Sequence, residues 1–316
     1  MTLFRRAIRL FLLITGILVG LITAVATLMA RRMIRPPRLR LWADPLDVGM
    51  PFEDVQFPAM DGLRLSGWFI PANETANLAG ATVVMVHGWP WNRLGHLVDD
   101  PMSRLIGEEA VDLLRLAHAY HHAGYNVFMF DLRNHGQSAE ATPVSFGLAE
   151  SEDLLGALSY LANRKDVDPQ HIMVTGFSMG ANATLFALPR TDLVRAAVLV
   201  QPTSAGHFSK NFAQHQFGPL SGPIYLMAEL IYQQFGGIAL DAIEPIFAAT
   251  GAGETPLLFV QGDGDPWGSV GNVAAMAAAT RQERDPLVAA TSDRFGGYKY
   301  VIDNPQVALD FFEQHS

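Results

Sequence analysis

The chain has 316 residues, of which 49% are hydrophobic and 17% charged, a balance that supports a large buried core and excludes intrinsic disorder. It has no cysteine, which excludes disulfide bonds, thiolate catalysis and cysteine–zinc sites. The first 40 residues hold eight arginines and no acidic residue, so of 22 basic and 31 acidic residues only 14 basic ones remain beyond them, a net charge of −17. Such a body repels nucleic-acid phosphates, and we expect no nucleic-acid partner.

The N-terminal 40 residues are predicted to be a membrane anchor and a basic linker. Residues 10–30 carry no charge and are mostly apolar, which at ~1.5 Å per residue is enough to cross a ~30 Å hydrocarbon layer. The alternative is a cleaved signal peptide, because Ala24-Val25-Ala26 resembles a cleavage site. The apolar run continues past that site to a pair of arginines, which favours a retained single-pass anchor. Five arginines after the run against three before it predict that residues 41–316 lie on the cytoplasmic side.

Strand-like and helix-like segments alternate through residues 41–316. A D-G turn at 61–62 joins two alternating segments, 54–57 and 63–70, into a hairpin. Further strands are expected at 81–86, 126–130, 171–175, 196–200, 256–260 and 286–290, and helices at 104–122, 154–161 and 305–314. This alternation predicts a mostly parallel sheet with helices on both faces. Residues 201–255 have no strand-like run and are expected to form a helical insert, either ordinary crossover packing or a cap that contacts substrate.

The segment Gly176-Phe177-Ser178-Met179-Gly180 follows a β-branched run and precedes a helical one. G-x-S-x-G between a strand and a helix is typical of a nucleophile elbow, a tight turn that exposes a serine hydroxyl above the sheet. Side chains at the two glycines would collide with the adjoining strand or helix. We therefore expect Ser178 to be the nucleophile of an acyl-transfer site.

Four motifs resemble those of the α/β-hydrolase superfamily over residues 52–314: residues 86–89, 131–136, 176–180 and 260–266. The likeness is to membrane-anchored bacterial serine hydrolases of the esterase and peptidase branches. It implies the α/β-hydrolase fold with an eight-stranded, mostly parallel sheet, no cofactor or metal, and a small acyl substrate. It also implies that the backbone N–H groups of Trp89 and Met179 form the oxyanion hole, and that Asp265, rather than the neighbouring Asp263, is the catalytic acid.

The sequence departs from this family at the base. The loop at 292–298 reads Ser-Asp-Arg-Phe-Gly-Gly-Tyr, and Phe295 occupies the approximate position of the expected histidine. We expect Phe295 or Arg294 to fill the space between Ser178 and Asp265. Of the histidines, only His207 and His215, in the insert, are expected to be able to reach Ser178.

Three further histidines are not expected to act as the base. His87 and His135 would brace their loops, and His315 would lie at the opposite edge of the sheet.

Three functions remain open from the sequence. The first is a serine hydrolase that cleaves an ester, thioester or amide through an acyl-enzyme at Ser178, with His207, His215 or water as base. The second is a catalytically weak or inactive hydrolase-fold protein with a binding or scaffold role at the membrane. The third uses Ser178 and the oxyanion hole only to polarise a carbonyl group.

Overall fold

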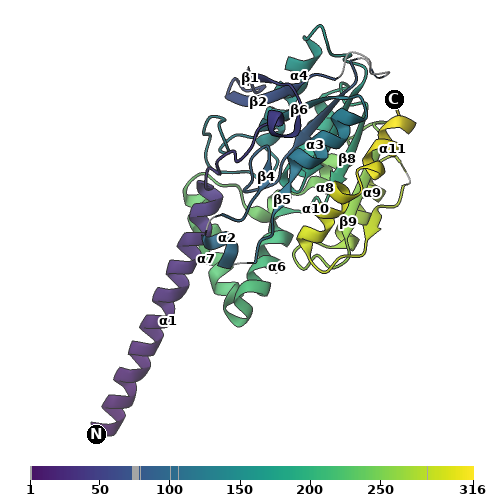
Figure 1. Cartoon of the computed structure of the whole chain (residues 1–316). Helices are drawn as coiled ribbons and strands as arrows, with labels where there is room; N and C mark the ends of the chain where they lie inside the picture. The colour runs from purple at the N-terminus through teal and green to yellow at the C-terminus, as the bar shows by residue number, and fades with distance from the viewer. Residues whose placement is uncertain (1, 73–77, 79, 100, 106, 283) are drawn as a thin grey trace.

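The computed structural model describes residues 2–72, 78, 80–99, 101–105, 107–282 and 284–316. A long helix, α1 (Thr2–Ile34), projects from a body in which a twisted sheet lies between two layers of helices (Figure 1). After α1 comes the short helix η1 (Pro45–Val48), which begins at an Asp44 capping box.

The sheet has eight strands in the order β1-β2-β6-β3-β7-β8-β9-β10. The strands are β1 (Glu53–Pro58), β2 (Arg64–Ile70), β3 (Thr82–Val86), β6 (Asn126–Asp131), β7 (Ile172–Phe177), β8 (Ala196–Val200), β9 (Leu257–Gly262) and β10 (Leu287–Ala289). The β1–β2 and β2–β6 pairs are antiparallel and the other five pairs are parallel. The predicted hairpin, the predicted strands and the mostly parallel sheet are therefore confirmed. A separate pair, β4 (Gly95–His96) and β5 (Val111–Asp112), lies outside this sheet.

The sheet has a hydrophobic core on each face, because its buried strands alternate side chains between the two faces. In β3, Val84 and Val86 pack on one face and Val83 and Met85 on the other. The first face is covered by α4 (Glu150–Ala162), α5 (Met179–Ala187), α8 (Pro245–Ala249) and α9 (Val270–Ala279). The second is covered by α3 (Leu113–His122), α10 (Arg294–Asp303) and α11 (Gln306–Gln314).

The helix expected at 104–122 is divided in two. A short helix, α2 (Pro101–Leu105), is followed by β5, and α3 begins only at Leu113. The Asp112 side chain accepts hydrogen bonds from the backbone N–H groups of Leu114 and Arg115. This N-cap fixes the start of α3, because the first turn of a helix lacks internal acceptors.

The insert at 201–255 is helical, as expected. It contains α6 (Ala205–Phe217), η3 (Gly218–Leu220), α7 (Ser221–Gln234), η4 (Leu240–Ala242) and α8. Helices α6 and α7 form a hairpin that lies beside the part of α1 nearest the body (Figure 1).

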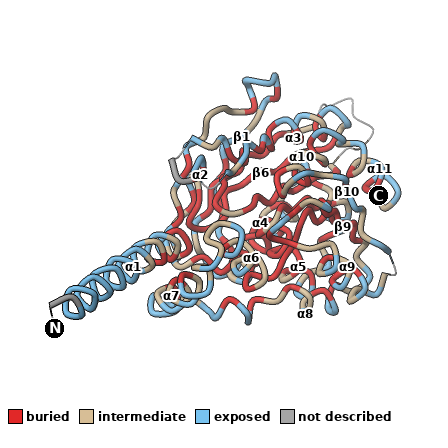
Figure 2. Tube along the Cα trace, turned by 90° about the horizontal axis from the view of Figure 1, so that it is seen from below, coloured by how far each residue is buried: buried red, intermediate tan, exposed pale blue. Residues whose placement is uncertain are grey.

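Helix α1 belongs partly to the body. Every residue from Phe4 to Leu21 is exposed, and Figure 2 shows this outer part standing free of the body. Beyond it, Ala26, Ala30 and Met33 are buried in the same core as α5 and α7, with Ile22 packed against them. These positions recur every three or four residues, so one face of the helix packs on the body while the opposite face stays exposed.

Candidate active site

Ser178 lies in the turn between β7 and α5, at the carboxyl end of a central strand, with φ 50° and ψ −112°. Positive φ is costly for a residue with a side chain and persists where the surrounding structure enforces it. A Cβ at Gly180 would lie 2.2 Å from the Val86 carbonyl oxygen, and one at Gly176 would lie 2.8 Å from the Ala181 Cα. The steric reason for both glycines of the motif is thus present in the structure.

The two backbone groups expected at an oxyanion hole belong to the first residue of α5 and to the loop after β3. Met179 is the first residue of α5, where a backbone N–H has no acceptor within its own helix. Trp89 lies in the loop after β3, with its ring edge-on to Phe146 at a centroid distance of 5.8 Å. Trp89, Ser178 and Met179 all line one cavity.

Asp265 follows β9 and is buried. Its carboxylate accepts hydrogen bonds from the backbone N–H of Trp267 at 2.9 Å, from that of Gly268 at 3.0 Å, and from the Gln261 side chain at 3.1 Å. Burial raises the pKa of Asp265, but the Arg294 guanidinium and these donors outweigh burial, and the net pKa lies below its ordinary value. Asp263 instead accepts from the Thr291 backbone N–H at 2.8 Å and holds a turn.

Arg294 connects Asp265 to Ser178. Its Nη1 donates to Asp265 Oδ2 at 2.5 Å, and its Nη2 donates to Ser178 Oγ at 3.0 Å. Burial lowers the pKa of Arg294, but the Asp265 carboxylate more than compensates, and the net pKa is raised. Of the two residues expected to fill this space, the structure selects Arg294.

The alignment of Phe295 with the base position is therefore wrong by one residue. The Phe295 ring packs on Trp267 and Tyr298 in the core. Helix α10 explains the shift: the Asp293 side chain accepts from the Gly296 backbone N–H, so the helix begins at Arg294. Arg294 is thereby directed to the carboxyl end of the sheet and Phe295 to its core.

Two further residues hold this site and were not expected from the sequence. The Gln201 carbonyl oxygen accepts from Arg294 Nη2 at 3.1 Å, and Gln201 Nε2 donates to the Arg294 carbonyl oxygen at 2.6 Å. The Tyr298 hydroxyl interacts with both Ser178 and Arg294. Burial raises the pKa of Tyr298 more than Arg294 lowers it, so at neutral pH it remains a protonated phenol.

The histidines of the insert have other partners. His207 Nε2 is hydrogen-bonded to Asn211 Nδ2 at 2.8 Å. His207 also lines a second surface cavity with Lys210 and Asp241. His215 Nδ1 accepts from Trp267 Nε1 at 3.0 Å, and the Trp267 ring lines the Ser178 cavity. His215 is thus the nearer of the two to the site by its contacts.

The other histidines lie where the sequence predicted. His87 and His135 are buried edge to face, and His87 Nε2 accepts from the Leu132 backbone N–H at 3.0 Å. Burial lowers the pKa of His87 to about 3, so its ring is neutral. His315 is at the C-terminus of α11, where its carbonyl oxygen accepts from Arg195.

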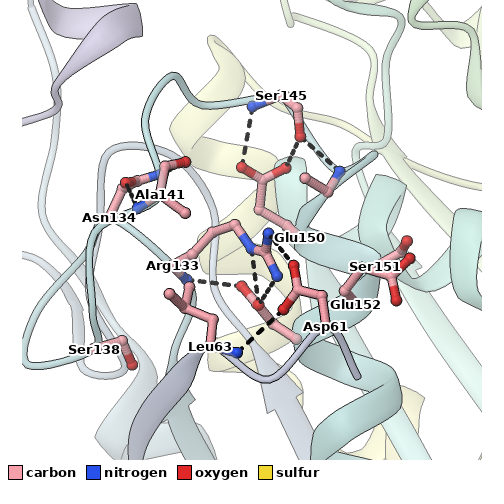
Figure 3. Close-up of polar contacts among 12 residues, drawn as sticks. Asp61, Leu63, Arg133, Asn134, Ser138, Ala141, Ser145, Glu150, Ser151 and Glu152 are labelled. Carbon is pink, nitrogen blue, oxygen red and sulfur yellow. Dashed lines mark hydrogen bonds and ion pairs between the residues drawn. The ribbon is translucent and has the colours of Figure 1, made fainter. Parts of the chain in front are cut away.

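A polar cluster around Glu150 and Arg133 (Figure 3) includes Ser145, the neighbour of the cavity residue Phe146. The Glu150 carboxyl group, near the top of the view, accepts from the backbone N–H and hydroxyl of Ser145 and from the Gly147 backbone N–H. Below it, Arg133 donates to Asp61 and to the buried Asp153. Asn182 of α5 donates to the Phe146 carbonyl oxygen at 3.1 Å, which ties the same loop to the elbow helix.

The cavity above Ser178 encloses about 110 Å³ and is mostly apolar. Its lining includes Ser178, Phe146, Ile224 and Ala228 of α7, and Met29 and Met33 of α1. Within the part of the chain that the structure describes, no group of three His, Asp or Glu side chains could hold a metal ion.

Known proteins share this architecture. A solved esterase from Pyrococcus furiosus superposes with a TM-score of 0.65 at 19% identity, covering 90% of this chain and 98% of the esterase. The acylaminoacyl peptidase of Pyrococcus horikoshii superposes with a TM-score of 0.60 at 18% identity, over 84% of this chain and 42% of the peptidase. These similarities confirm the predicted fold, an eight-stranded, mostly parallel sheet of the α/β-hydrolase type.

Comparison of sequences also finds similar proteins. The Escherichia coli (strain K12) protein YfhR is 32% identical over 221 residues, which are 68% of this chain and 64% of YfhR, so the chain spans just under two thirds of that relative. A thiohydrolase of Arthrinium phaeospermum is 29% identical over 151 residues, 48% of this chain and 43% of the enzyme. The model of the alpha/beta hydrolase family matches residues 83–311. By that match, and by the strand order and serine turn described above, the chain belongs to the alpha/beta hydrolase family.

Proposed function

We propose that this protein binds an acyl ligand at Ser178 and hydrolyses it weakly or not at all, as a hydrolase-fold binding protein at a membrane. One observation carries the proposal: the group that joins Asp265 to Ser178 is the Arg294 guanidinium, which donates to both. A general base must accept the proton of the attacking hydroxyl. Arginine has no acceptor and stays protonated in proteins, so Arg294 cannot do this.

The neighbours of Ser178 do not supply a base in its stead. Tyr298 keeps its proton because its pKa is raised, and the Asp265 carboxylate is paired with Arg294. A serine hydroxyl without a base is a poor nucleophile, although an oxyanion hole and binding alone retain ~10³–10⁴-fold over water in a disabled triad. Weak residual turnover is therefore compatible with the proposal.

The remaining parts of the site suit binding of a carbonyl group with an apolar chain. The N–H groups of Trp89 and Met179 would donate to the carbonyl oxygen as an oxyanion hole, and the apolar cavity beyond Phe146 would take the chain. The ligand class is thus an ester, thioester or carboxylic acid with a hydrophobic acyl group.

We include membrane anchoring in the proposal. The helix Phe4–Ile34 is long and apolar enough to cross a bilayer, and a signal sequence would pass the same test. Because Ala26 and Ala30 pack in the core of the body, cleavage after Ala26 would divide a helix whose inner face is already part of the fold. We propose that this helix is a retained single-pass anchor with residues 41–316 on the cytoplasmic side.

A serine hydrolase with an acyl-enzyme at Ser178 is the second candidate. The strained turn at Ser178 favours it, because such strain exposes a nucleophile and costs stability in a protein that does not use it. In that case His215, whose partner Trp267 lines the cavity, is the better of the two insert histidines as base.

The test is to restore the missing base. Arg294→His should raise the hydrolysis of a p-nitrophenyl ester over the parent by part of the ~10²–10⁴-fold that a general base contributes. Phe295→His, one residue further on, is the matched control and should give no gain, because its ring lies in the core. Ser178→Ala in the Arg294→His background should remove the gain.

Labelling with a fluorophosphonate separates the two candidates. The parent should label slowly and Arg294→His should label much faster, both at Ser178. Fast labelling of the parent that His215→Ala abolishes would establish the hydrolase and overturn the binding proposal.

A further inference from the structure

We propose that the outer face of α7 lies within the bilayer together with α1, and that the cavity takes the acyl chain of a membrane lipid sideways, between these two helices. This inference names the ligand class of the site and rests on the proposed function. It also rests on a geometric mismatch between the apolar span of α1 and the free part of that helix.

The free part of α1 is too short to cross a membrane by itself. The uncharged run begins after Arg9 and ends before Arg31, whereas the helix meets the body at Ile22. Residues 10–21 rise only ~18 Å, against ~30 Å for a hydrocarbon layer. Drawing Arg5, Arg6 and Arg9 into the layer instead would cost up to ~2.5–3.5 kcal/mol for each arginine that reaches its centre. The last ~12 Å of hydrocarbon therefore lies beside residues 22–30.

Helix α7 lies at that same level. Its buried residues Ile224 and Ala228 belong to the core that contains Ala26 and Ala30 of α1. The Tyr232 hydroxyl donates to the Val144 carbonyl oxygen, and the Val144 backbone N–H donates to the Met33 carbonyl oxygen. The C-terminal ends of α7 and α1 thus meet in the body, and α7 extends from there along α1 in the direction of the proposed membrane, as Figure 1 shows.

The face of α7 turned away from the body suits such a layer. Leu226 is 60% exposed and Leu230 61% exposed, one helical turn apart. The exposed positions of α7 carry no charge. Its acidic residue, Glu229, accepts from the Leu240 backbone N–H. Large exposed leucines on one uncharged face mark a surface that contacts an apolar partner, and continuity with α1 identifies that partner as lipid.

The cavity connects this layer to Ser178. Met29 and Met33 of α1 and Ile224 and Ala228 of α7 line the same cavity as Ser178. A lipid chain that enters between the two helices would meet a lining that is mostly apolar, with Arg32, Glu108 and Glu229 among its charged members. Its ester carbonyl would then be presented to Trp89, Met179 and Ser178. Arg31, exposed on α1 at the end of the span, lies where phosphate headgroups would be.

The depth of α7 can be measured directly because the chain has no native cysteine. We would reconstitute full-length Leu226→Cys, Leu230→Cys, Leu18→Cys and Met60→Cys, each with a nitroxide label, in phosphatidylcholine–phosphatidylglycerol vesicles. Leu18 on the free part of α1 is the reference within the layer, and Met60, 57% exposed on the turn between β1 and β2, is the aqueous control. The ratio of collision rates with oxygen and with a water-soluble nickel chelate reports depth.

Labels at positions 226 and 230 should collide more often with oxygen than with the nickel chelate, in a ratio similar to that of the label at position 18. Ratios equal to that at position 60 would overturn the placement of α7. In the second arm, phosphatidylcholine with a diazirine at the end of one acyl chain should cross-link to the cavity wall, and Ala228→Trp should reduce this severalfold. Cross-links confined to residues 10–21 would overturn the lateral entry. Neither arm depends on the gain in Arg294→His, so failure of the proposed function would be seen separately.

Discussion

The buried pair Arg294–Asp265 gives a quantitative prediction for stability. Both side chains are almost completely buried, with exposed fractions of 3% and 0%, and Nη1 lies 2.5 Å from Oδ2. Arg294→Gln removes the cation and leaves the Asp265 charge buried without its partner. Breaking a buried pair from one side costs ~3–5 kcal/mol. With a midpoint change of ~2–4 °C per kcal/mol for a body of this size, Tm should fall by roughly 10 °C.

The stability lost in Arg294→Gln should also depend on pH, in a direction that follows from the pKa of Asp265. In the parent, Asp265 has a lowered pKa, so the stability it contributes is present above its unfolded pKa and is lost as the pH falls through the folded value. In Arg294→Gln, burial is no longer opposed by the guanidinium and the folded pKa moves upward. The cost of the substitution should therefore be largest at neutral pH and shrink as the pH falls, because Asp265 takes up its proton at a higher pH in the variant than in the parent.

Thermal unfolding followed by circular dichroism in detergent micelles measures both effects. Arg294→Gln combined with Asp265→Asn should recover part of the loss, because it leaves no unpaired charge. Arg281→Gln is the matched control, since Arg281 and Glu254 form an exposed pair 3.3 Å apart and should contribute less than ~1 kcal/mol. The reasoning is refuted if Arg294→Gln is as mild as Arg281→Gln at pH 7, or if the two site substitutions are additive.

Two further predictions concern the supports of the site. Gly180→Ala should prevent stable folding, because its Cβ would lie 2.2 Å from the Val86 carbonyl oxygen. The control Gly16→Ala, whose Cβ meets nothing within 4 Å, should leave expression and Tm unchanged. Equal yields of folded protein from the two variants would contradict this reasoning. Glu150→Ala leaves three donors without their acceptor and should lower the free energy of unfolding in urea by about 3–5 kcal/mol. The control Glu152→Ala, which breaks a partly exposed pair with Arg190, should lower it by less than ~1 kcal/mol. Equal losses from the two variants would contradict the role of the cluster.

Most of the fold could be predicted from the sequence because its causes are local. The run 196–200 is apolar throughout and the run 81–86 is apolar except for Thr82, as is typical of strands buried on both faces. The turn at Ser178 could be predicted for a similar reason, since its two glycines are required by atoms that lie too close to leave room for a Cβ. The boundary between the N-terminal anchor at 1–40 and the body at 41–316 stays a prediction.

The site was only partly predictable because the residue that faces Ser178 depends on where helix α10 begins. Whether residue 294 or 295 faces Ser178 is decided by the cap at Asp293, which a one-residue change in register would reverse. Gln201 was missed for a different reason. It contributes its backbone carbonyl as well as its side chain, and a backbone contact with a residue 93 positions away leaves no pattern in the sequence.

The shared core of α1 and α7 means that α1 and the rest of the chain cannot be exchanged as independent modules. A shortened protein that begins at residue 41 would lose Met29 and Met33 from the cavity wall and would expose the side chains of Ile224 and Ala228 to water. Removing α1 would thus leave an exposed apolar groove along α7 and would open the cavity at Ser178 at the same time. Ligand affinities measured on such a protein would describe a different pocket, and nanodiscs or detergent are the appropriate setting for functional work.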